Sequence, residues 1–197
     1  MVFRISTVNK LYVDFDNTIV NTTKSIVDLY NEDYMYYDKY KYVDWTDIKT
    51  WGFQELTLLK KGKIYEYFNQ PRLFKNVQFF DNAKRSLDWL SNFYEIYIVS
   101  AGHTPNLKQK EIWLKENLPY TKFIGVNNEI YDDKSHVDMS DGFFIDDVSK
   151  NLITSNAYHG ICFGNEYSWN DDWTGTRCQT WIEVNRFLMA SLLQEEV

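Results

Sequence analysis

Three apolar runs in this chain end in side chains suited to phosphoryl transfer. The run 11–13 leads into Asp14-Phe15-Asp16-Asn17-Thr18, the run 94–99 leads into Ser100, and the run 142–145 leads into Asp146-Asp147. Short apolar runs of this kind predict strands that are buried on both faces of a parallel sheet. Ligands of such sheets bind beyond the carboxyl ends of the strands. We therefore expect these acidic and hydroxyl groups to converge on one site.

The convergent groups fit a single reaction. Phosphoryl transfer needs an in-line nucleophile, cations around the equatorial oxygens and a proton for the leaving group. Asp14 can attack phosphorus and form an aspartyl-phosphate. Asp16 can protonate the departing oxygen and then deprotonate the water that hydrolyses the intermediate. Ser100 can donate a hydrogen bond to a phosphoryl oxygen.

A magnesium ion and a lysine would supply the cations. Magnesium prefers hard oxygen ligands and takes few carboxylates. Asp14 and Asp146 would offer carboxylates, and Asp16 would offer its backbone carbonyl. Lys134 precedes the strand that ends in Asp146 and is the favoured lysine. Its competitors, Lys108 and Lys110, fall in the helix predicted after Ser100, where lysines are expected on the solvated face.

The elements that must position these groups alternate along the chain. The runs 123–126 and 160–163 predict two further strands. A helix is expected after Asp81-Asn82, and another at Thr104-Pro105, where a hydroxyl cap precedes a proline. Apolar residues at helical spacing within 182–192 predict a closing helix. This alternation predicts an α/β fold, a five-stranded parallel sheet flanked by helices.

The segment 19–80 breaks this alternation and is too long for an ordinary connection. It carries many of the aromatic residues, and helices are plausible around 23–31 and 54–68. We interpret it as a small helical cap inserted after the first strand. The predicted division is a core formed by 1–18 and 81–197 and a cap formed by 19–80.

Composition narrows the class of partner. The 197 residues carry a net charge of −7, which disfavours a nucleic acid polymer because such binding rests on basic side chains. The two cysteines show neither zinc-like spacing nor a disulfide framework. The first residues resemble neither a signal peptide nor a membrane span, so a cytoplasmic protein without a membrane partner is expected.

The ordered motifs resemble those of the haloacid dehalogenase (HAD) superfamily. That resemblance implies Asp14 as nucleophile, Asp16 as acid/base, Ser100 as the second motif and Lys134 as the third. It also implies Mg²⁺ as cofactor, with Asp146 as a ligand and Asp147 contacting a metal-bound water. One departure is Asn17, where the family often has glycine. Asparagine tolerates a left-handed backbone better than most residues do.

A narrower resemblance concerns the 5'(3')-deoxyribonucleotidases, especially bacterial and phage members. It rests on the cap after the first motif, the short chain, the Asp-Asp motif and the stretches 165–170 and 181–183. It implies hydrolysis of nucleoside monophosphates, with cap aromatics stacking on the base for about 1–3 kcal/mol. The sequence offers Trp45, Phe53 and Phe74 as candidates for that role.

Other interpretations stay open from the sequence. An isolated Asp-x-Asp is usually a turn or a helix cap, and Asp147 could cap the next helix. Within the enzyme class, the substrate could be a sugar phosphate or another small phosphate. An end-processing phosphatase for polynucleotides is disfavoured by the acidic charge. Outside that class, a non-catalytic HAD-like binding protein is the alternative. The oligomeric state also stays open, a homodimer included.

Overall fold

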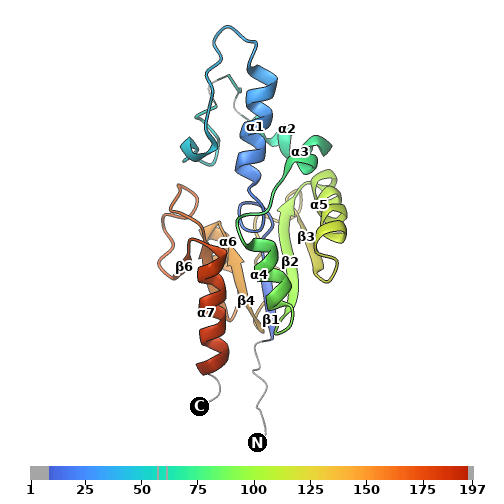
Figure 1. Cartoon of the computed structure of the whole chain (residues 1–197), viewed down its shortest axis with the longest axis vertical. Coiled ribbons are helices and arrows are strands. Elements are labelled where there is room, and N and C mark those ends of the chain that lie inside the picture. The colour runs from blue at the N-terminus through green and yellow to red at the C-terminus, as the bar shows by residue number, and fades with distance from the viewer. Residues whose placement is uncertain (1–8, 57, 61, 195–197) are drawn as a thin grey trace, which may run out of the picture.

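The computed structural model describes residues 9–56, 58–60 and 62–194, which form a core around one sheet and a smaller helical lobe (Figure 1). The six strands are β1 (Lys10–Val13), β2 (Glu95–Gly102), β3 (Lys122–Asn127), β4 (Gly142–Asp146), β5 (His159–Phe163) and β6 (Thr176–Cys178). All pairings are parallel, in the order β3-β2-β1-β4-β5-β6. The predicted α/β class and parallel sheet are confirmed.

The strand count differs from the prediction of five. The sixth strand, β6, has three residues, Thr-Arg-Cys, and pairs only with β5 at the edge of the sheet. It has no apolar run, since one of its three residues is Arg177. Periodicity cannot detect so short an element, and only its pairing with β5 identifies it as a strand.

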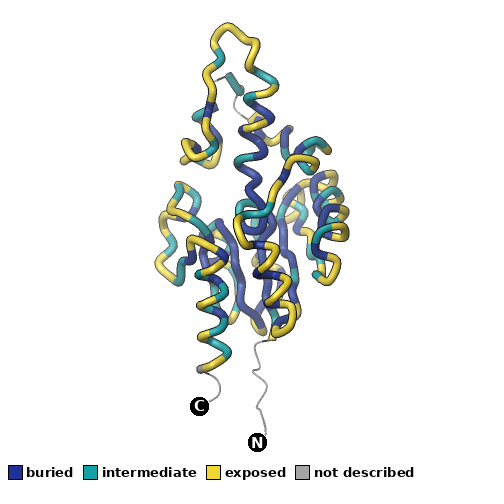
Figure 2. The backbone as a smooth tube through the Cα atoms, in the orientation of Figure 1, coloured by how far each residue is buried: buried dark blue, intermediate teal, exposed yellow. Residues whose placement is uncertain are grey.

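Helices cover both faces of the sheet. The core helices are α4 (Ala83–Leu90), α5 (Thr104–Asn117), α6 (Ser149–Thr154) and α7 (Trp181–Gln194). Leu11 and Val13 of β1 pack in one apolar cluster with residues of α4, α5 and α7, whereas Tyr12 packs in another with Leu152 of α6. The buried backbone in Figure 2 follows these strands. Alternate strand residues thus face opposite layers, as the pleat requires.

Two of the expected helix starts differ in detail. Asn82 adopts a left-handed conformation with φ of 64° and makes no side-chain cap hydrogen bond. Helix α5 begins at Thr104 itself, so His103 is its N-cap residue and Thr104 is not. The closing helix is confirmed, although Ile182, predicted on its apolar face, is exposed.

The smaller lobe comprises α1 (Thr22–Tyr34), a 3-10 helix η1 (Trp45–Asp47), α2 (Ile64–Phe68) and α3 (Pro71–Asn76). It has its own apolar cluster, which includes Ile26, Tyr30 and Leu73. The helix expected around 23–31 is confirmed, but of the stretch 54–68 only α2 is helical, and residues 57 and 61 lie outside the described residues.

The two chain segments that join the lobes lie side by side. Phe80 N–H donates to Ile19 C=O at 2.9 Å, and Asn21 N–H donates to Gln78 C=O at 2.9 Å. Val20 forms an antiparallel bridge with Phe79. The lobe is therefore attached through one paired connection directly after the Asp14–Thr18 motif. None of the described helices is long and apolar enough to cross a membrane.

Candidate active site

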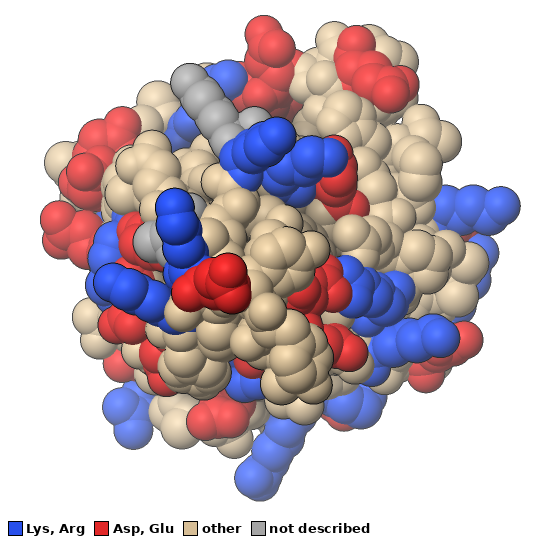
Figure 3. Space-filling view, turned by 90° about the horizontal axis from the view of Figure 1, so that it is seen from above, with Lys and Arg blue, Asp and Glu red and all other residues tan. Residues whose placement is uncertain are grey.

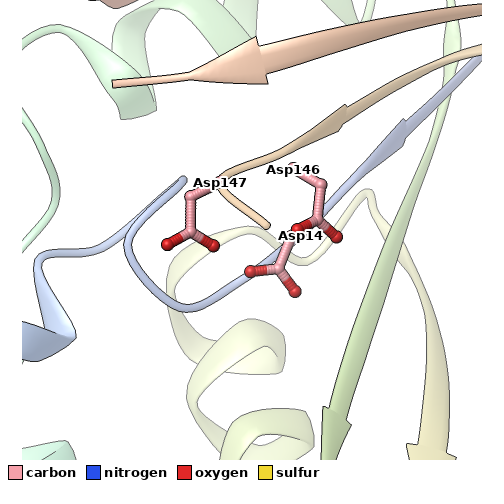
Figure 4. A group of neighbouring side chains, drawn as sticks. All are labelled: Asp14, Asp146 and Asp147. Carbon is pink, nitrogen blue, oxygen red and sulfur yellow. The ribbon is translucent and has the colours of Figure 1, made fainter. Parts of the chain in front are cut away.

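Three carboxylates meet at the ends of β1 and β4, where the order of strands switches from one side of β1 to the other. Val13 and Ile145 are paired in register, so Asp14 and Asp146 leave adjacent strands together, and Asp14 N–H donates to Ile145 C=O at 2.8 Å. Asp147 follows Asp146. One oxygen from each of the three lies within 4.8 Å of the others. Figure 4 shows the three carboxylates grouped at the ends of these strands.

Lys134 sits among these carboxylates. It is 1% exposed, and its ammonium contacts Asp14 Oδ1 and lies 2.6 Å from Asp146 Oδ2. Asp146 also accepts from Val148 N–H at 2.8 Å and from Asn151 Nδ2 at 3.1 Å. The favoured lysine thus bridges the candidate nucleophile and a candidate metal ligand. Asn151, which the sequence reading missed, fixes the orientation of Asp146.

Burial and neighbouring charges shift the pKa of each of these groups. Burial raises the pKa of Asp14 above its usual range; Lys134 opposes that rise, while Asp146 adds to it. Burial and the neighbouring Asp146 and Asp14 also raise the pKa of Asp147 well above its usual value. Burial alone would lower the pKa of Lys134, but Asp14 and Asp146 outweigh it and raise that pKa. One lysine therefore faces three buried carboxyl groups, and a further cation would relieve their mutual repulsion.

The donor set fits magnesium. All three side chains offer carboxylate oxygens, the hard ligands that Mg²⁺ prefers, and they converge at the carboxyl end of the sheet beside an open cavity. The Asp16 carboxylate is not part of this group among the described residues, and the expected role of its backbone carbonyl stays a prediction.

Asp16 is held by a second lysine instead. Lys110 is fully buried, and its ammonium contacts Asp16 Oδ2, lies 2.9 Å from Ser100 Oγ and 2.9 Å from Ala101 C=O. Thr22 Oγ1 donates to Asp16 Oδ1 at 2.7 Å. The expectation that Lys110 lies on a solvated helix face was wrong. Its spacing from Leu107 and Leu114 places it on the apolar face of α5, a signal that the sequence did contain.

The remaining motif residues occupy consistent positions. Ser100 is buried inside β2 and is not a helix cap. Asn17 adopts φ of 53°, the left-handed conformation for which asparagine is suited, and its Oδ1 accepts from Thr23 N–H at 2.9 Å. Asp147 Oδ2 accepts from Trp169 Nε1 at 2.9 Å rather than capping α6.

A cavity of about 620 Å³ opens above these groups. Its walls include Asp14, Asp16, Lys134 and Asp147 from the core, and Trp51, Phe53, Tyr65 and Phe68 from the smaller lobe. Of the three aromatic candidates from the sequence, only Phe53 lines this cavity. Trp45 lines a smaller adjoining cavity, and Phe74 packs against Phe15 at 6.4 Å between ring centroids.

Trp169, another residue that the sequence reading did not single out, connects the two lobes. Its ring stacks on Tyr167 with 4.6 Å between centroids, and it meets Trp51 of the smaller lobe edge-on at 5.9 Å. Ser168 N–H donates to Lys49 C=O at 3.3 Å nearby. The loop that positions Asp147 therefore also contacts the smaller lobe.

Comparisons with known proteins identify relatives of this sequence and of its fold. A 5'(3')-deoxyribonucleotidase of Clostridium acetobutylicum is 33% identical over 114 residues, which is 57% of this chain and 61% of that protein, less than two thirds of its length. A haloacid dehalogenase-like hydrolase of Streptococcus pneumoniae shares the fold with a TM-score of 0.65 at 14% identity, covering 92% of this chain and 99% of that one. A HAD-hydrolase of Bacillus subtilis bound to magnesium matches with a TM-score of 0.53 at 13% identity, covering 91% and 98%.

The family comparison covers nearly the whole chain. Residues 7–194 match the family model of the 5' nucleotidase, deoxy (Pyrimidine), cytosolic type C proteins. This span contains all four motifs, both lysines and the aromatic lobe. The chain therefore belongs to the family of the 5' nucleotidase, deoxy (Pyrimidine), cytosolic type C proteins.

Proposed function

We propose that the protein is a Mg²⁺-dependent 5'(3')-deoxyribonucleotidase that hydrolyses nucleoside monophosphates to nucleoside and phosphate. The observation that carries the proposal is the two-sided cavity, with Asp14, Asp16 and Lys134 on one side and a group of aromatic rings on the other. The first side suits a phosphate and the second suits a flat base. The matching family and the C. acetobutylicum relative point to the same activity.

In this proposal Asp14 is the nucleophile. Its carboxylate attacks phosphorus, the bond to the leaving oxygen breaks, and an aspartyl-phosphate forms. Asp16, oriented by Lys110 and Thr22, protonates the leaving alkoxide. Asp16 then takes a proton from the water that attacks the intermediate, which restores Asp14 and releases phosphate. Ser100 and Lys134 interact with the phosphoryl oxygens.

Magnesium would be held by the carboxylates of Asp14 and Asp146 and by the backbone carbonyl of Asp16, with Asp147 contacting a bound water. When bound, the ion would neutralise charge on the phosphoryl oxygens. Lys134 balances part of the acidic charge before substrate arrives, since it already contacts Asp14 and Asp146.

The proposed division into domains follows from the same roles. The catalytic core would be 1–18 and 81–197, and the cap that binds the base would be 19–80; residues 1–8 and 195–197 lie outside the described residues. A polymer substrate is disfavoured, because Figure 3 shows basic and acidic side chains interspersed across the upper face rather than a basic stripe.

The test is phosphate release from a panel of deoxynucleoside monophosphates, ribonucleoside monophosphates and sugar phosphates, with Mg²⁺ or with EDTA. We expect deoxynucleotides to lead the panel, EDTA to abolish activity and Asp14→Asn to be inactive while still folded by circular dichroism. Acid-quenched wild-type protein should carry a phosphoryl adduct on the peptide that contains Asp14. Preferential turnover of sugar phosphates would overturn the substrate assignment, and an active Asp14→Asn variant would overturn the mechanism.

A further inference from the structure

Asn170 carries a fully hydrogen-bonded amide next to the candidate metal site. The residue is fully buried in the loop between β5 and β6. Its Oδ1 accepts from Tyr167 N–H at 3.0 Å and from Arg177 Nη1 at 3.2 Å. Its Nδ2 donates to Asn165 C=O at 3.2 Å and to Asp147 C=O at 2.9 Å. The amide thus uses both of its donors and both lone pairs, and such a buried network fixes one orientation.

Arg177 connects this amide to the edge of the sheet. The residue lies on the short strand β6, and its Nη2 donates to Asn170 C=O at 2.7 Å while its Nη1 donates to Asn170 Oδ1. A guanidinium holds two acceptors of one residue in a rigid planar geometry that the ammonium of a lysine does not reproduce. Because β6 is paired with β5, Arg177 anchors Asn170 to the sheet.

The contact that leads from Asn170 to the site is its hydrogen bond to the main chain of Asp147. The preceding residue, Trp169, holds the side chain of Asp147, since its Nε1 donates to Oδ2 at 2.9 Å. Consecutive residues of one loop therefore fix both the main chain and the carboxylate of Asp147. Negative charges on Asp14 and Asp146 oppose a third carboxylate beside them, so the position of that carboxylate depends on such contacts.

We propose that Asn170 is a positioning residue for Mg²⁺, which holds the main chain of Asp147 so that its carboxylate faces those of Asp14 and Asp146, and that Arg177 holds Asn170 in turn. This inference rests on the proposed Mg²⁺-dependent function and adds residues that do not touch the ion. The same hydrogen bonds stabilise the loop, so the test has to separate metal affinity from folding stability.

The experiment measures the Kd for Mg²⁺ by isothermal titration calorimetry of the substrate-free protein, together with the Tm, for wild type, Asn170→Ala and Asn31→Ala. Asn31 is the matched control, because its Nδ2 donates to Val43 C=O at 2.8 Å and its Oδ1 accepts from Val43 N–H at 3.2 Å, in the smaller lobe and outside the cavity. We expect Asn170→Ala to raise the Kd for Mg²⁺ by about tenfold. Asn31→Ala should lower the Tm but leave that Kd unchanged.

A second comparison determines whether Asn170 acts through Asp147. Asp147→Asn should itself weaken Mg²⁺ binding, and the addition of Asn170→Ala should raise the Kd no further, because the group that Asn170 positions is already altered. Full additivity of the two changes would overturn the inference. An Asn170→Ala protein with the Mg²⁺ Kd of wild type would also overturn it, whatever its Tm.

Arg177→Lys keeps the inference testable if Asn170→Ala does not fold. Lysine retains the positive charge but not the paired contact with Asn170, so the Kd for Mg²⁺ should rise in this variant as well. An unchanged Kd would contradict the role of the network. Wild type that binds no Mg²⁺ would instead overturn the metal dependence of the proposed function, whereas wild-type binding with unchanged variants would overturn only the inference.

Discussion

The buried ammonium of Lys110 contacts Asp16 Oδ2, although the two residues are 94 positions apart in the sequence. The same ammonium lies 2.9 Å from Ser100 Oγ, so one side chain orients both the proposed acid/base and the second-motif hydroxyl. Lys110 is fully buried, whereas Asp16 is partly open to the cavity. Lys110 is therefore a positioning residue, and the chain uses two buried lysines at the site.

Replacement of Lys110 by Met should lower kcat on the order of tenfold to a hundredfold, because a misplaced acid/base loses part of its contribution. Methionine fills similar volume without the charge. Lys108→Met, which alters an exposed lysine of the same helix, is the control and should behave as wild type. Steady-state kinetics and thermal unfolding together measure the effect. A Lys110→Met enzyme that keeps wild-type kcat would contradict the assigned role.

Trp169 should influence the metal site through its indole N–H, which donates to Asp147 Oδ2. Trp169→Phe keeps an aromatic ring against Tyr167 and Trp51 but removes the donor. Groups that orient metal ligands typically change metal affinity by about 10–100-fold when removed. We expect the Mg²⁺ concentration for half-maximal activity to rise by about tenfold.

The control for this change is Trp173→Phe, whose indole N–H donates to Thr176 C=O at 2.9 Å and does not reach the carboxylates. Activity is measured against Mg²⁺ concentration at saturating substrate. An unchanged Mg²⁺ requirement in Trp169→Phe would show that Asp147 does not depend on this hydrogen bond.

Phe53 should contribute to binding of the base. It lines the cavity and adopts φ of 49°, a strained conformation for a bulky residue that is typical of functional positions. Phe53→Ala should raise KM for nucleotides on the order of tenfold, since stacking contributes about 1–3 kcal/mol per base. It should leave KM for ribose 5-phosphate, which lacks a base, unchanged. Tyr36→Ala, at a position that is 87% exposed, is the control. Equal effects on both substrates would argue against stacking.

The smaller lobe should lose stability in acid through Asp33. Arg72 donates to Asp33 Oδ1 at 2.7 Å and Tyr67 donates to Asp33 Oδ2 at 2.9 Å, tying α1 to α2 and α3. The Arg72 guanidinium, together with Tyr67, lowers the pKa of Asp33 below its ordinary 3.8. A lowered folded-state pKa stabilises the protein above the ordinary value, and that contribution is lost as the pH falls through the folded value.

Arg72→Leu should therefore lower the free energy of unfolding at pH 7 by about 1 kcal/mol or less, because the pair is partly solvated and screened. The difference in unfolding free energy between Arg72→Leu and wild type should shrink as the pH falls below about 4, which is close to the ordinary pKa of an aspartic acid. Urea unfolding across this range measures it. Asp33→Asn should show the same loss of stability at neutral pH. A difference in unfolding free energy between wild type and Arg72→Leu that does not change with pH would contradict the role of the charge.

The local sequence pattern was enough to predict the strands that carry the candidate catalytic groups. Each buried strand is a contiguous apolar run, so β1, β2 and β4 could be read directly, and the groups that follow them share one edge of the sheet by topology. The short edge strand β6 was missed because three residues carry no period. The stretch 54–68 was expected to contain a helix, but among its described residues only 64–68 are helical, and Gly62 just before them has a left-handed φ of 85°.

By itself, the sequence determined the motif groups Asp14, Asp16, Ser100 and Asp146-Asp147, because each follows directly from its own strand. The sequence favoured Lys134, but tertiary structure decided that Lys110 reaches the site as well. Lys110 and Lys134 both turn inward because the carboxylates that they contact offset the cost of burying an ammonium, a compensation that depends on neighbours distant in sequence. The aromatic wall of the cavity was decided in the same way, since composition supplies many rings and only packing selects those that face the ligand.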